Sequence, residues 1–217
     1  MITFHTDAIF QDGRKIPIRN IYCVGRNYRD HAKELNNPIP KEPLYFQKST
    51  ASIAQSNQIT IPKETEIHHE LELVLCLGKD VFDPVELDIE NDIAGFTIGL
   101  DLTDRTSQSE LKANGKPWFW AKSFKNSSIL GPFYNNGLFP LDKDFVLKKN
   151  GIPVQTGRVN DMIFSIEYLL KRLVSRVPLL CGDIVFTGTP SGVGQLQTGD
   201  ILDIIHGDEE LYSITIL

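Results

Sequence analysis

The chain contains 217 residues, of which 41% are hydrophobic, 23% charged and 9% aromatic, as in ordinary folded globular proteins. This balance excludes disordered, collagen-like and coiled-coil proteins. The 22 Lys and Arg residues against 28 Asp and Glu give a net charge of -6, which argues against a nucleic acid held through its phosphates. We therefore expect no nucleic-acid partner, whereas an excess of carboxylates suits a hard divalent cation.

Short apolar runs that end at Gly, Asp or Pro predict a chain built mostly of short strands. The last two runs flank Gly207-Asp-Glu-Glu and predict a hairpin. In chain order the predicted strands are Ile21–Val24, Ile59–Ile61, Leu71–Leu77, Ala94–Leu102, Phe145–Lys149, Ile184–Thr187, Ile201–Ile205 and Leu211–Ile216.

Capping residues and helical spacing of apolar residues predict three helices. They span Asn27–Leu35, which Asn27 is expected to cap, Asp104–Ala113, and the most amphipathic segment, Ser165–Val174. Because strands and helices do not alternate regularly, the pattern predicts a mixed α+β fold rather than a doubly wound sheet or an α/β barrel. No linker or internal repeat interrupts the sequence, so we expect residues 1–217 to form a single domain.

The three cysteines, Cys23, Cys76 and Cys181, are far apart and flanked by apolar residues, a setting typical of buried free thiols rather than disulfides or a zinc site. The first residues lack the basic and apolar regions of a leader peptide, and no stretch approaches the roughly 18 apolar residues of a membrane span. We therefore expect a cytoplasmic protein with no membrane contact.

In the first helix, His31 and Glu34 lie one turn apart on the same face. A carboxylate beside an imidazole fixes the tautomer of the ring, as in a general base that accepts a proton from water. A solvated surface contact is the alternative interpretation of this pair.

The segment His68-His-Glu70-Leu-Glu72-Leu-Val places two carboxylates on one face of a strand, roughly 6–7 Å apart along it. Carboxylate oxygens without thiolates suit Mg²⁺, Mn²⁺ or Ca²⁺. A solvated edge strand is the alternative, but Glu72 leads directly into an apolar run, which favours a site at the edge of the core.

A third carboxylate, Asp101, ends another apolar strand and precedes Arg105 and Gln108. These last two residues are three apart on a predicted helix, so both could hold the oxygens of an anionic ligand. Asp101 could instead cap that helix, and this segment alone does not separate the two interpretations.

Two further segments could bind an anion. Lys122 stands among aromatic residues, where a desolvated ammonium could stabilise an oxyanion, or where its stem could cover aromatic surface while its head reaches water. A Gly-rich loop follows the strand at Ile184, from Thr187 to Gly194, and its N–H groups could cradle a carboxylate or phosphate. A plain turn is the alternative there.

In this order along the chain, the segments resemble the fumarylacetoacetate hydrolase family, in particular its small acylpyruvase and oxaloacetate decarboxylase branch. The resemblance extends from about Ile21 to the C-terminus. It is carried by Val24-Gly-Arg-Asn-Tyr-Arg-Asp-His31-Ala-Lys-Glu34, His68-His-Glu70-Leu-Glu72-Leu, Leu100-Asp101-Leu-Thr-Asp-Arg105-Thr-Ser-Gln108, Trp120-Ala-Lys122-Ser-Phe, Met162-Ile-Phe-Ser165 and Thr187-Gly-Thr189-Pro-Ser-Gly-Val-Gly194.

The resemblance implies a site as well as a fold. It implies a strand-rich α+β domain of layered, rolled sheets, generally a homodimer, that holds Mg²⁺ or Mn²⁺ on three carboxylates beside a water-activating pair. Carried over residue by residue, the metal ligands are Glu70, Glu72 and Asp101, the water-activating pair is His31 and Glu34, and the residues around the substrate are Arg26, Gln108, Lys122 and Thr189. Arg105 joins this last group through its place beside Gln108.

The sequence departs from the family pattern at Lys48-Ser49-Thr50, where acylpyruvases commonly have Lys-Pro-Ser. Loss of the proline removes a fixed φ angle and adds an N–H group, so we expect the change to bear on the substrate rather than on the metal.

The resemblance implies hydrolysis of the C–C bond of a 3-acylpyruvate, a small anionic 2,4-dioxo acid, to pyruvate and a carboxylic acid. His31 would activate the water, and the metal and Lys122 would stabilise the enolate that is released. Decarboxylation of oxaloacetate or keto–enol isomerisation of a related dioxo acid would use the same metal and enolate. A protein that binds a metal and a small acid without catalysis is the third possibility.

Overall fold

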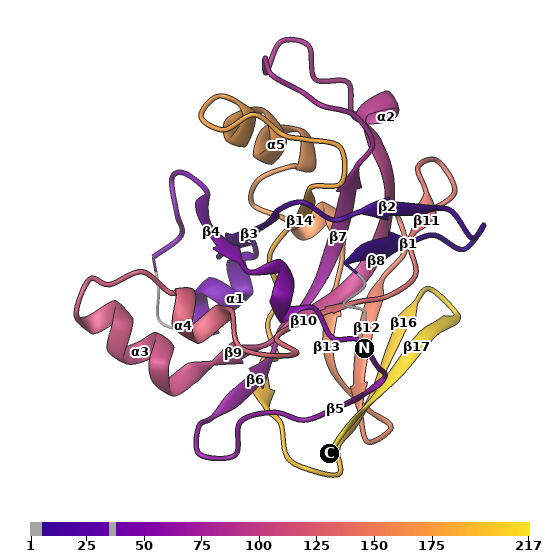
Figure 1. Cartoon of the computed structure of the whole chain (residues 1–217). Helices are drawn as coiled ribbons and strands as arrows, with labels where there is room; N and C mark the ends of the chain where they lie inside the picture. Colours follow the sequence, from indigo (N-terminus) through magenta and orange to yellow (C-terminus); the bar gives the residue numbers. More distant parts are fainter. Residues whose placement is uncertain (1–5, 35–37) are drawn as a thin grey trace.

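The computed structural model describes residues 6–34 and 38–217. Within them the chain forms a strand-rich fold with short helices, as predicted (Figure 1). A seven-stranded mixed sheet forms its centre, in the order β10 (Ser128–Leu130), β8 (Ile93–Asp101), β7 (Leu71–Leu77), β14 (Ile184–Phe186), β3 (Ile21–Gly25) and β4 (Leu44–Lys48), with β11 (Tyr134–Asn135) also paired to β8.

Three smaller sheets surround this centre. The five-stranded sheet has the order β13 (Ile152–Gly157), β12 (Phe145–Lys149), β16 (Ile201–His206), β17 (Glu209–Ile216) and β5 (Gln58–Ile59). The three-stranded sheet has the order β15 (Gly194–Gln195), β6 (Ile67–His69) and β9 (Thr103–Asp104), and β1 (Asp7–Ile9) pairs with β2 (Lys15–Pro17).

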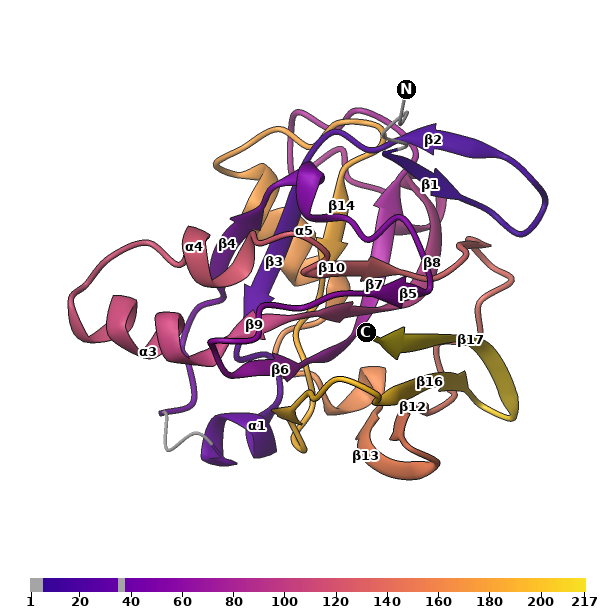
Figure 2. The same ribbon diagram turned by 60° about the horizontal axis from the view of Figure 1, so that its bottom comes forward.

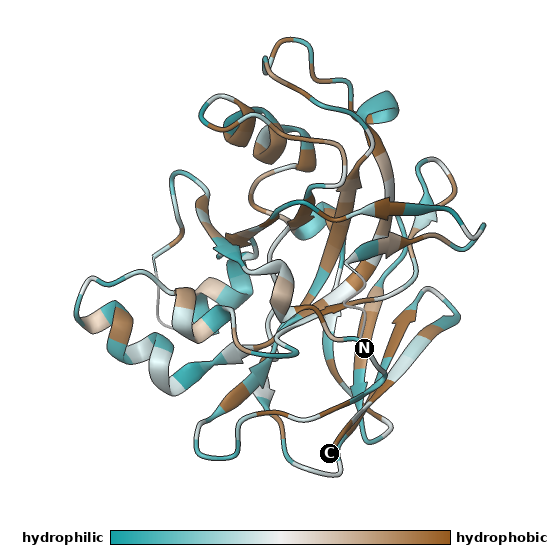
Figure 3. Cartoon of the chain, in the orientation of Figure 1, coloured by the Kyte–Doolittle hydropathy of each residue, from teal (hydrophilic) through white to brown (hydrophobic). Residues whose placement is uncertain are grey.

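The central sheet is buried on both faces, which explains why its strands are apolar almost throughout. All seven residues of β7 are buried, and successive side chains of a strand point to opposite faces. Leu73 and Leu75 therefore join the larger core, formed with α5 (Ile166–Val174) and the five-stranded sheet. Val74 and Cys76 join a smaller core with β1, β3 and β14, and Figure 3 shows the central strands as the most hydrophobic part of the fold.

Two central strands are interrupted where the chain passes into the three-stranded sheet. Glu70 lies between β6 and β7, and Leu102 lies between β8 and β9. The two interruptions are adjacent, because the N–H of Asp101 donates to the carbonyl of Glu70 at 2.9 Å. Two acidic side chains are thereby brought together at the junction of two sheets.

The remaining helices are short and lie near this junction. They are α1 (Arg29–Glu34), α3 (Arg105–Ala113), α4 (Phe119–Lys122) and, further away, α2 (Ile89–Asp92), together with 3-10 turns at Thr50–Ser52 and Val159–Asp161. Figures 1 and 2 both show α3 and α4 side by side at the edge formed by β4 and β9. No helix in the described part of the chain is long and apolar enough to cross a membrane.

The predicted elements are present, with different ends and caps. Helix α1 begins at Arg29, two residues later than predicted, because Asn27 does not cap it. The buried Asn27 side chain instead accepts from the N–H of Phe164 and donates to the carbonyl of Thr187. The predicted last residue of this helix, Leu35, lies outside the described residues.

The two other predicted helices each have a side chain that caps their N-terminus. Ser165 accepts from the N–H of Tyr168 and caps α5 as predicted. Helix α3 is capped by Asp104, whose side chain accepts from the N–H of Ser107. Capping by Asp101 is therefore wrong, because the residue three positions later takes that role.

The final hairpin is confirmed, with a tighter turn than predicted, since only Gly207 and Asp208 separate β16 from β17. The predicted strand at Ile59–Ile61 is shifted to Gln58–Ile59. The three cysteines are free, but Cys181 is half-buried where a buried residue was predicted. Several strands were not predicted, among them β2 and β13, because many of their residues are exposed and form no apolar run.

Gly182, just before β14, is a position at which a side chain is expected to be costly. Its φ is +88°, and an added Cβ would lie 2.0 Å from the carbonyl oxygen of Pro17. Gly13 is a matched control with φ +85° and no atom within 4 Å. Gly13→Ala is expected to cost about 1–2 kcal/mol of unfolding free energy, and Gly182→Ala about 3 kcal/mol or more. Equal losses in urea unfolding would contradict this close contact.

Candidate active site

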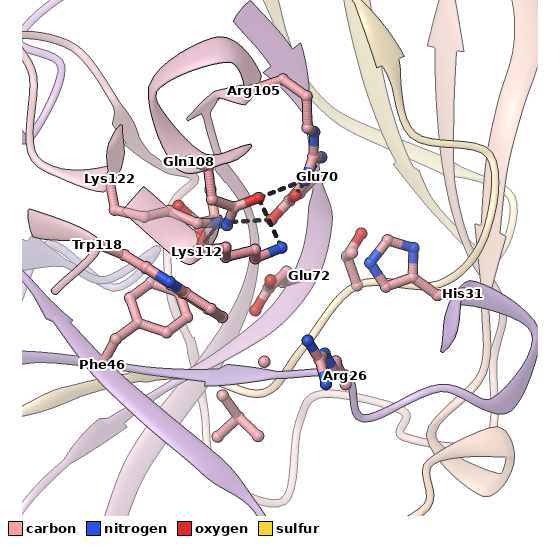
Figure 4. Close-up of a pocket in the computed structure, with 14 residues that line it drawn as sticks. Arg26, His31, Phe46, Glu70, Glu72, Arg105, Gln108, Lys112, Trp118 and Lys122 are labelled. Atoms are coloured by element: carbon pink, nitrogen blue, oxygen red, sulfur yellow. Dashed lines mark hydrogen bonds and ion pairs between the residues drawn. The ribbon is translucent and has the colours of Figure 1, made fainter. Parts of the chain in front are cut away.

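Nine of the ten predicted site residues line one cleft at the junction of the central and three-stranded sheets (Figure 4). The cleft is open to solvent. The tenth residue, Glu34, does not line it but contacts His31, which does. The predicted residues are therefore neighbours in space although they come from five separate segments.

The three predicted metal ligands form one buried cluster. Glu70, Glu72 and Asp101 are 5%, 2% and 0% exposed, and they offer oxygen atoms that all lie within 4.8 Å of one another. The alternative of a solvated edge strand is wrong, because the strand is paired on both sides and its carboxylates face the cleft.

Three cations contact two of these carboxylates. The ammonium of Lys122 donates to Glu70 at 2.6 Å and to Asp101 at 2.7 Å. Lys48 donates to the other oxygen of Asp101 at 2.6 Å, and Arg105 to the other oxygen of Glu70 at 2.6 Å. Burial opposes ionisation of Glu70, but Lys122 and Arg105 outweigh it and hold its pKa below the usual value. The head of Lys122 therefore lies within the acidic cluster and does not reach water.

Glu72 has no cationic partner among the described residues. The hydrogen bond to it that the structure shows comes from the N–H of Gly188, at 2.7 Å. Burial, followed by the nearby charges of Asp101 and Glu70, raises the pKa of Glu72 well above its usual value. A buried carboxylate that lacks a counter-charge is costly unless a cation is supplied.

A divalent metal ion fits this donor set. Three buried carboxylates supply oxygen ligands without thiolates, the set that Mg²⁺ and Mn²⁺ prefer, and Glu72 gains the positive charge that it lacks. The three carboxylates are balanced by Lys48, Lys122 and Arg105. A bound divalent ion would therefore make the cluster positive by about two charges, within a chain whose net charge is -6.

The His31 and Glu34 pair has the geometry of an oriented base. Nδ1 of His31 lies 3.0 Å from a carboxylate oxygen of Glu34, and His31 is only 5% exposed. Because an ionised carboxylate only accepts hydrogen bonds, Nδ1 carries the proton, and Nε2 of the neutral ring keeps a free lone pair. Of the pair, His31 is buried at the cleft, whereas Glu34 is exposed.

The Gly-rich loop after β14 holds two carboxylates of the protein itself. The N–H of Gly188 binds Glu72, and the N–H of Gly192 binds Glu34 at 3.0 Å. Both glycines have positive φ angles, +103° and +97°, which residues other than glycine rarely adopt. The loop was expected to cradle a carboxylate or phosphate or to form a plain turn, and two of its N–H groups bind carboxylates of the protein, those of a predicted metal ligand and of the partner of the predicted base.

The residues predicted around the substrate approach from both sides of the cluster. Figure 4 shows Arg105, Gln108 and Lys122 gathered on one side of Glu72, with Arg26 on the other. The oxygen of Gln108 accepts from Arg105 at 2.8 Å and from Lys112 at 3.1 Å. Its amide N–H₂ is therefore free to donate to a ligand.

Two cations in the cleft have no carboxylate partner among residues 6–34 and 38–217. Arg26 leaves β3 with a left-handed φ of 62°, a conformation that often marks a functional position. Lys112, in α3, lies 4.9 Å from the ring of Trp118 and was not predicted from the sequence. Both residues line the cleft, so both are available to an anionic ligand.

The departure from the family pattern at Ser49 leaves the backbone almost unchanged. Ser49 has φ −68°, the angle that a proline would impose, and its added N–H donates to Ser123 Oγ at 3.1 Å. The neighbouring Lys48, which contacts Asp101, belongs to the site but was not predicted. Lys48 is the last residue of β4 and follows the polar Gln47, so no local pattern marked it as a site residue.

Comparisons with known proteins agree with this geometry. Residues 20–210 match the family described as "Fumarylacetoacetate (FAA) hydrolase C-terminal". A mitochondrial oxaloacetate tautomerase from Caenorhabditis elegans is 41% identical, and the alignment covers 84% of this chain and 87% of that protein. A mitochondrial oxaloacetate decarboxylase from Dictyostelium discoideum is 38% identical, with 85% of this chain and 87% of that protein covered.

The fold is also shared with solved structures. A fumarylpyruvate hydrolase from Pseudomonas aeruginosa, crystallised with Mn²⁺ and pyruvate, superposes with a TM-score of 0.90 at 30% identity, covering 100% of this chain and 98% of that one. The chain therefore belongs to the fumarylacetoacetate hydrolase family and has its strand-rich fold of curled sheets. It is an enzyme of that family.

Proposed function

We propose that this protein is a divalent-metal-dependent enzyme that interconverts the keto and enol forms of oxaloacetate. The observation that carries the proposal is that two cations in one cleft, Arg26 and Lys112, have no carboxylate partner among the described residues. Oxaloacetate has a carboxylate at each end, so each cation can meet one of them. The names of the two relatives support this substrate, and they favour it over the acylpyruvate that the sequence predicted first.

We propose Glu70, Glu72 and Asp101 as the ligands of Mg²⁺ or Mn²⁺. When bound, the ion supplies Lewis-acid stabilisation of the negative charge that develops on the C2 oxygen of the substrate. The crystallised fumarylpyruvate hydrolase contains Mn²⁺, which supports a divalent ion in this family.

The chain supplies the base and the anion-binding groups. Nε2 of His31 removes a proton from C3 while the electron pair of that C–H bond moves toward the C2 oxygen, and protonation of that oxygen gives the enol. Glu34 holds the ring in the required tautomer and stabilises the imidazolium that forms. The amide of Gln108 and the ammonium of Lys122 lie in the same cleft and stabilise the enolate.

A substrate panel tests the proposal. Initial rates with oxaloacetate, acetylpyruvate and fumarylpyruvate are measured on metal-free protein with and without added Mg²⁺. We expect metal-dependent loss of the enol absorbance of oxaloacetate without a matching release of pyruvate. Metal-dependent release of pyruvate from an acylpyruvate, without turnover of oxaloacetate, would assign the protein to hydrolysis instead.

Hydrolysis of an acylpyruvate is the second candidate, and one observation favours it. The pair of the buried His31 and the exposed Glu34 could equally activate a water, and a solved relative is named fumarylpyruvate hydrolase. Decarboxylation of oxaloacetate, in which CO₂ leaves from C4, would form the enolate of pyruvate, as hydrolysis of an acylpyruvate does, but without a base. A protein that binds the metal and acid without catalysis predicts no turnover in the panel at all.

Lys112 is expected to set the preference for a second carboxylate. Lys112→Met should raise KM roughly 10-fold for oxaloacetate and much less for acetylpyruvate, which lacks that carboxylate. Burial, then the charges of Arg105 and Arg26, lowers the pKa of Lys112 to about 8. The ammonium is charged below that pH, so kcat/KM for oxaloacetate should fall above it, and this fall should disappear in Lys112→Met. The control is the exposed Lys116→Met, and equal KM changes for both substrates would contradict the assignment.

Two earlier expectations remain proposals. We propose that the protein forms a homodimer and acts in the cytoplasm, although both named relatives are mitochondrial. Sedimentation and cell fractionation test the two statements separately.

A further inference from the structure

A buried amide, that of Gln155, connects the five-stranded sheet to the cleft. Gln155 lies in β13 and is 2% exposed. Its oxygen lies 3.0 Å from the N–H of Leu71 and 2.8 Å from Nδ1 of His69. Its nitrogen lies 3.0 Å from the carbonyl of Pro190 and 2.9 Å from the hydroxyl oxygen of Thr189. No sequence pattern distinguishes Gln155 from other polar residues, and it has no role in the reaction proposed for this site.

The orientation of this amide follows from its two backbone partners. The N–H of Leu71 only donates, so the atom facing it must be the oxygen of Gln155. The carbonyl of Pro190 only accepts, so the atom facing it must be the nitrogen. His69 then donates from Nδ1 to the same oxygen. Every hydrogen-bonding atom of the Gln155 amide is therefore used, and the amide cannot turn over without breaking bonds at both ends.

This orientation determines what the hydroxyl of Thr189 can do. Both N–H bonds of the Gln155 amide are donors, one to Pro190 and the other to the Thr189 oxygen. The Thr189 hydroxyl therefore accepts from the protein, and its own proton has no acceptor among the described residues. Thr189 is 3% exposed and lines the cleft, so a ligand in the cleft is the remaining acceptor.

We propose that Gln155 is a positioning residue that makes Thr189 a hydrogen-bond donor to an anionic oxygen of the ligand. The identity of that ligand as oxaloacetate, or a smaller 2-oxo acid, rests on the function proposed above. The orientation of the hydroxyl does not, because it follows from the network of Gln155 alone. A threonine left free to rotate could present either its proton or its lone pairs to a carboxylate, and only the first arrangement is attractive.

The test reverses the polarity of the amide. In Gln155→Glu the side chain keeps its shape and still accepts from Leu71 and His69, but it loses both donated hydrogen bonds, to Thr189 and to the carbonyl of Pro190. The Thr189 hydroxyl is expected to turn and donate to the new carboxylate, which leaves its lone pairs facing the ligand. KM for oxaloacetate should rise roughly 10- to 100-fold, as for a lost hydrogen bond to a charged group, with kcat changed much less.

A double-mutant cycle separates positioning from a general structural role. Thr189→Val should raise KM by a similar factor, and Gln155→Glu should add little in the Thr189→Val background, because the hydroxyl through which it acts is gone. Thr189→Ser keeps a hydroxyl donor, so its KM should rise less than that of Thr189→Val. Gln155→Met neither donates a hydrogen bond nor carries a charge, so it should raise KM by a smaller factor. It replaces Gln155→Glu in the cycle if that variant does not fold. The same KM increase from Gln155→Glu with and without Thr189 would overturn the proposal.

Binding without turnover distinguishes this inference from the proposed function. The probe is pyruvate, added to the Mn²⁺-loaded protein and measured by calorimetry. Gln155→Glu should weaken pyruvate binding roughly 10-fold or more in the presence of Thr189 and little in Thr189→Val. If the wild-type protein binds pyruvate in this way but does not turn over oxaloacetate, the proposed function fails and the inference stands. If pyruvate binding is unchanged by Gln155→Glu, the inference fails whatever the substrate is.

Discussion

Replacing Glu72 with glutamine is expected to lower metal-dependent turnover of oxaloacetate by at least about 100-fold, while the metal-free protein becomes no less stable. The two effects have opposite directions for one reason. Without the ion, Glu72 is a buried carboxylate beside Asp101 and Glu70, and its raised pKa means that burial and these charges disfavour the ionised form. Glutamine cannot ionise, so the metal-free protein no longer has to bury a carboxylate there. The same change removes the anionic oxygen that would bind the divalent ion.

Thermal unfolding with and without Mg²⁺ measures both effects in one experiment. For the wild type, Mg²⁺ at 100 times Kd adds about 2.7 kcal/mol, or about 5–10 °C in Tm for a chain of this length. The increase should be lost in Glu72→Gln and retained in the control Glu110→Gln, which alters an exposed residue of α3. A Glu72→Gln variant that keeps both the Mg²⁺-dependent Tm increase and the activity would exclude Glu72 as a ligand.

His31→Ala is expected to produce the second large effect, and to separate the reactions open to this site. Removal of a general base lowers rates by about 10²–10⁴-fold, so ketonisation of oxaloacetate and hydrolysis of acylpyruvates should both fall by this amount. Decarboxylation needs the metal and the enolate but no base to start it, so any metal-dependent decarboxylation should persist. Glu34→Gln should give a smaller loss, because it keeps an acceptor for Nδ1 and removes only the charge.

The control for this variant is His68→Ala. His68 is a histidine close in sequence to the metal ligands, but its ring contacts Glu66 instead of lining the cleft. The three reactions are followed separately, by enol absorbance, release of pyruvate and release of CO₂. Equal loss of all three in His31→Ala would contradict a role as base and would indicate that the substitution disturbs the metal cluster.

The acidic cluster was predictable because its members lie at strand ends next to long apolar runs. Glu70 and Glu72 are two residues apart, so strand alternation alone places them on one face, and Asp101 meets them through the pairing of two strongly apolar neighbours. The His31 and Glu34 pair is local to one helix. For these residues a short window of sequence contains most of the geometric information.

The remaining contacts depend on pairings that a short window does not contain. Lys48 reaches Asp101 across 53 positions and Gln155 reaches Thr189 across 34, and nothing near either residue distinguishes it from an ordinary polar residue. The partners of the Gly-rich loop could not be predicted for the same reason, since the carboxylates that Gly188 and Gly192 bind come from distant segments. Short strands such as β6 and β9 were missed because they are extensions of longer strands beyond one-residue interruptions.

A metal titration of the wild-type protein tests the central claim most directly. Metal-free protein receives increasing Mg²⁺, and the initial rate of ketonisation of enol-oxaloacetate is measured at each concentration, after subtraction of the rate with Mg²⁺ alone. We predict a hyperbolic rise from near zero by at least about 100-fold, with the same half-saturation as the Mg²⁺-dependent increase in Tm. A rate that is independent of Mg²⁺ and Mn²⁺, or no enzymatic rate at saturating metal, would contradict the assignment of this cleft as a metal-dependent site for oxaloacetate.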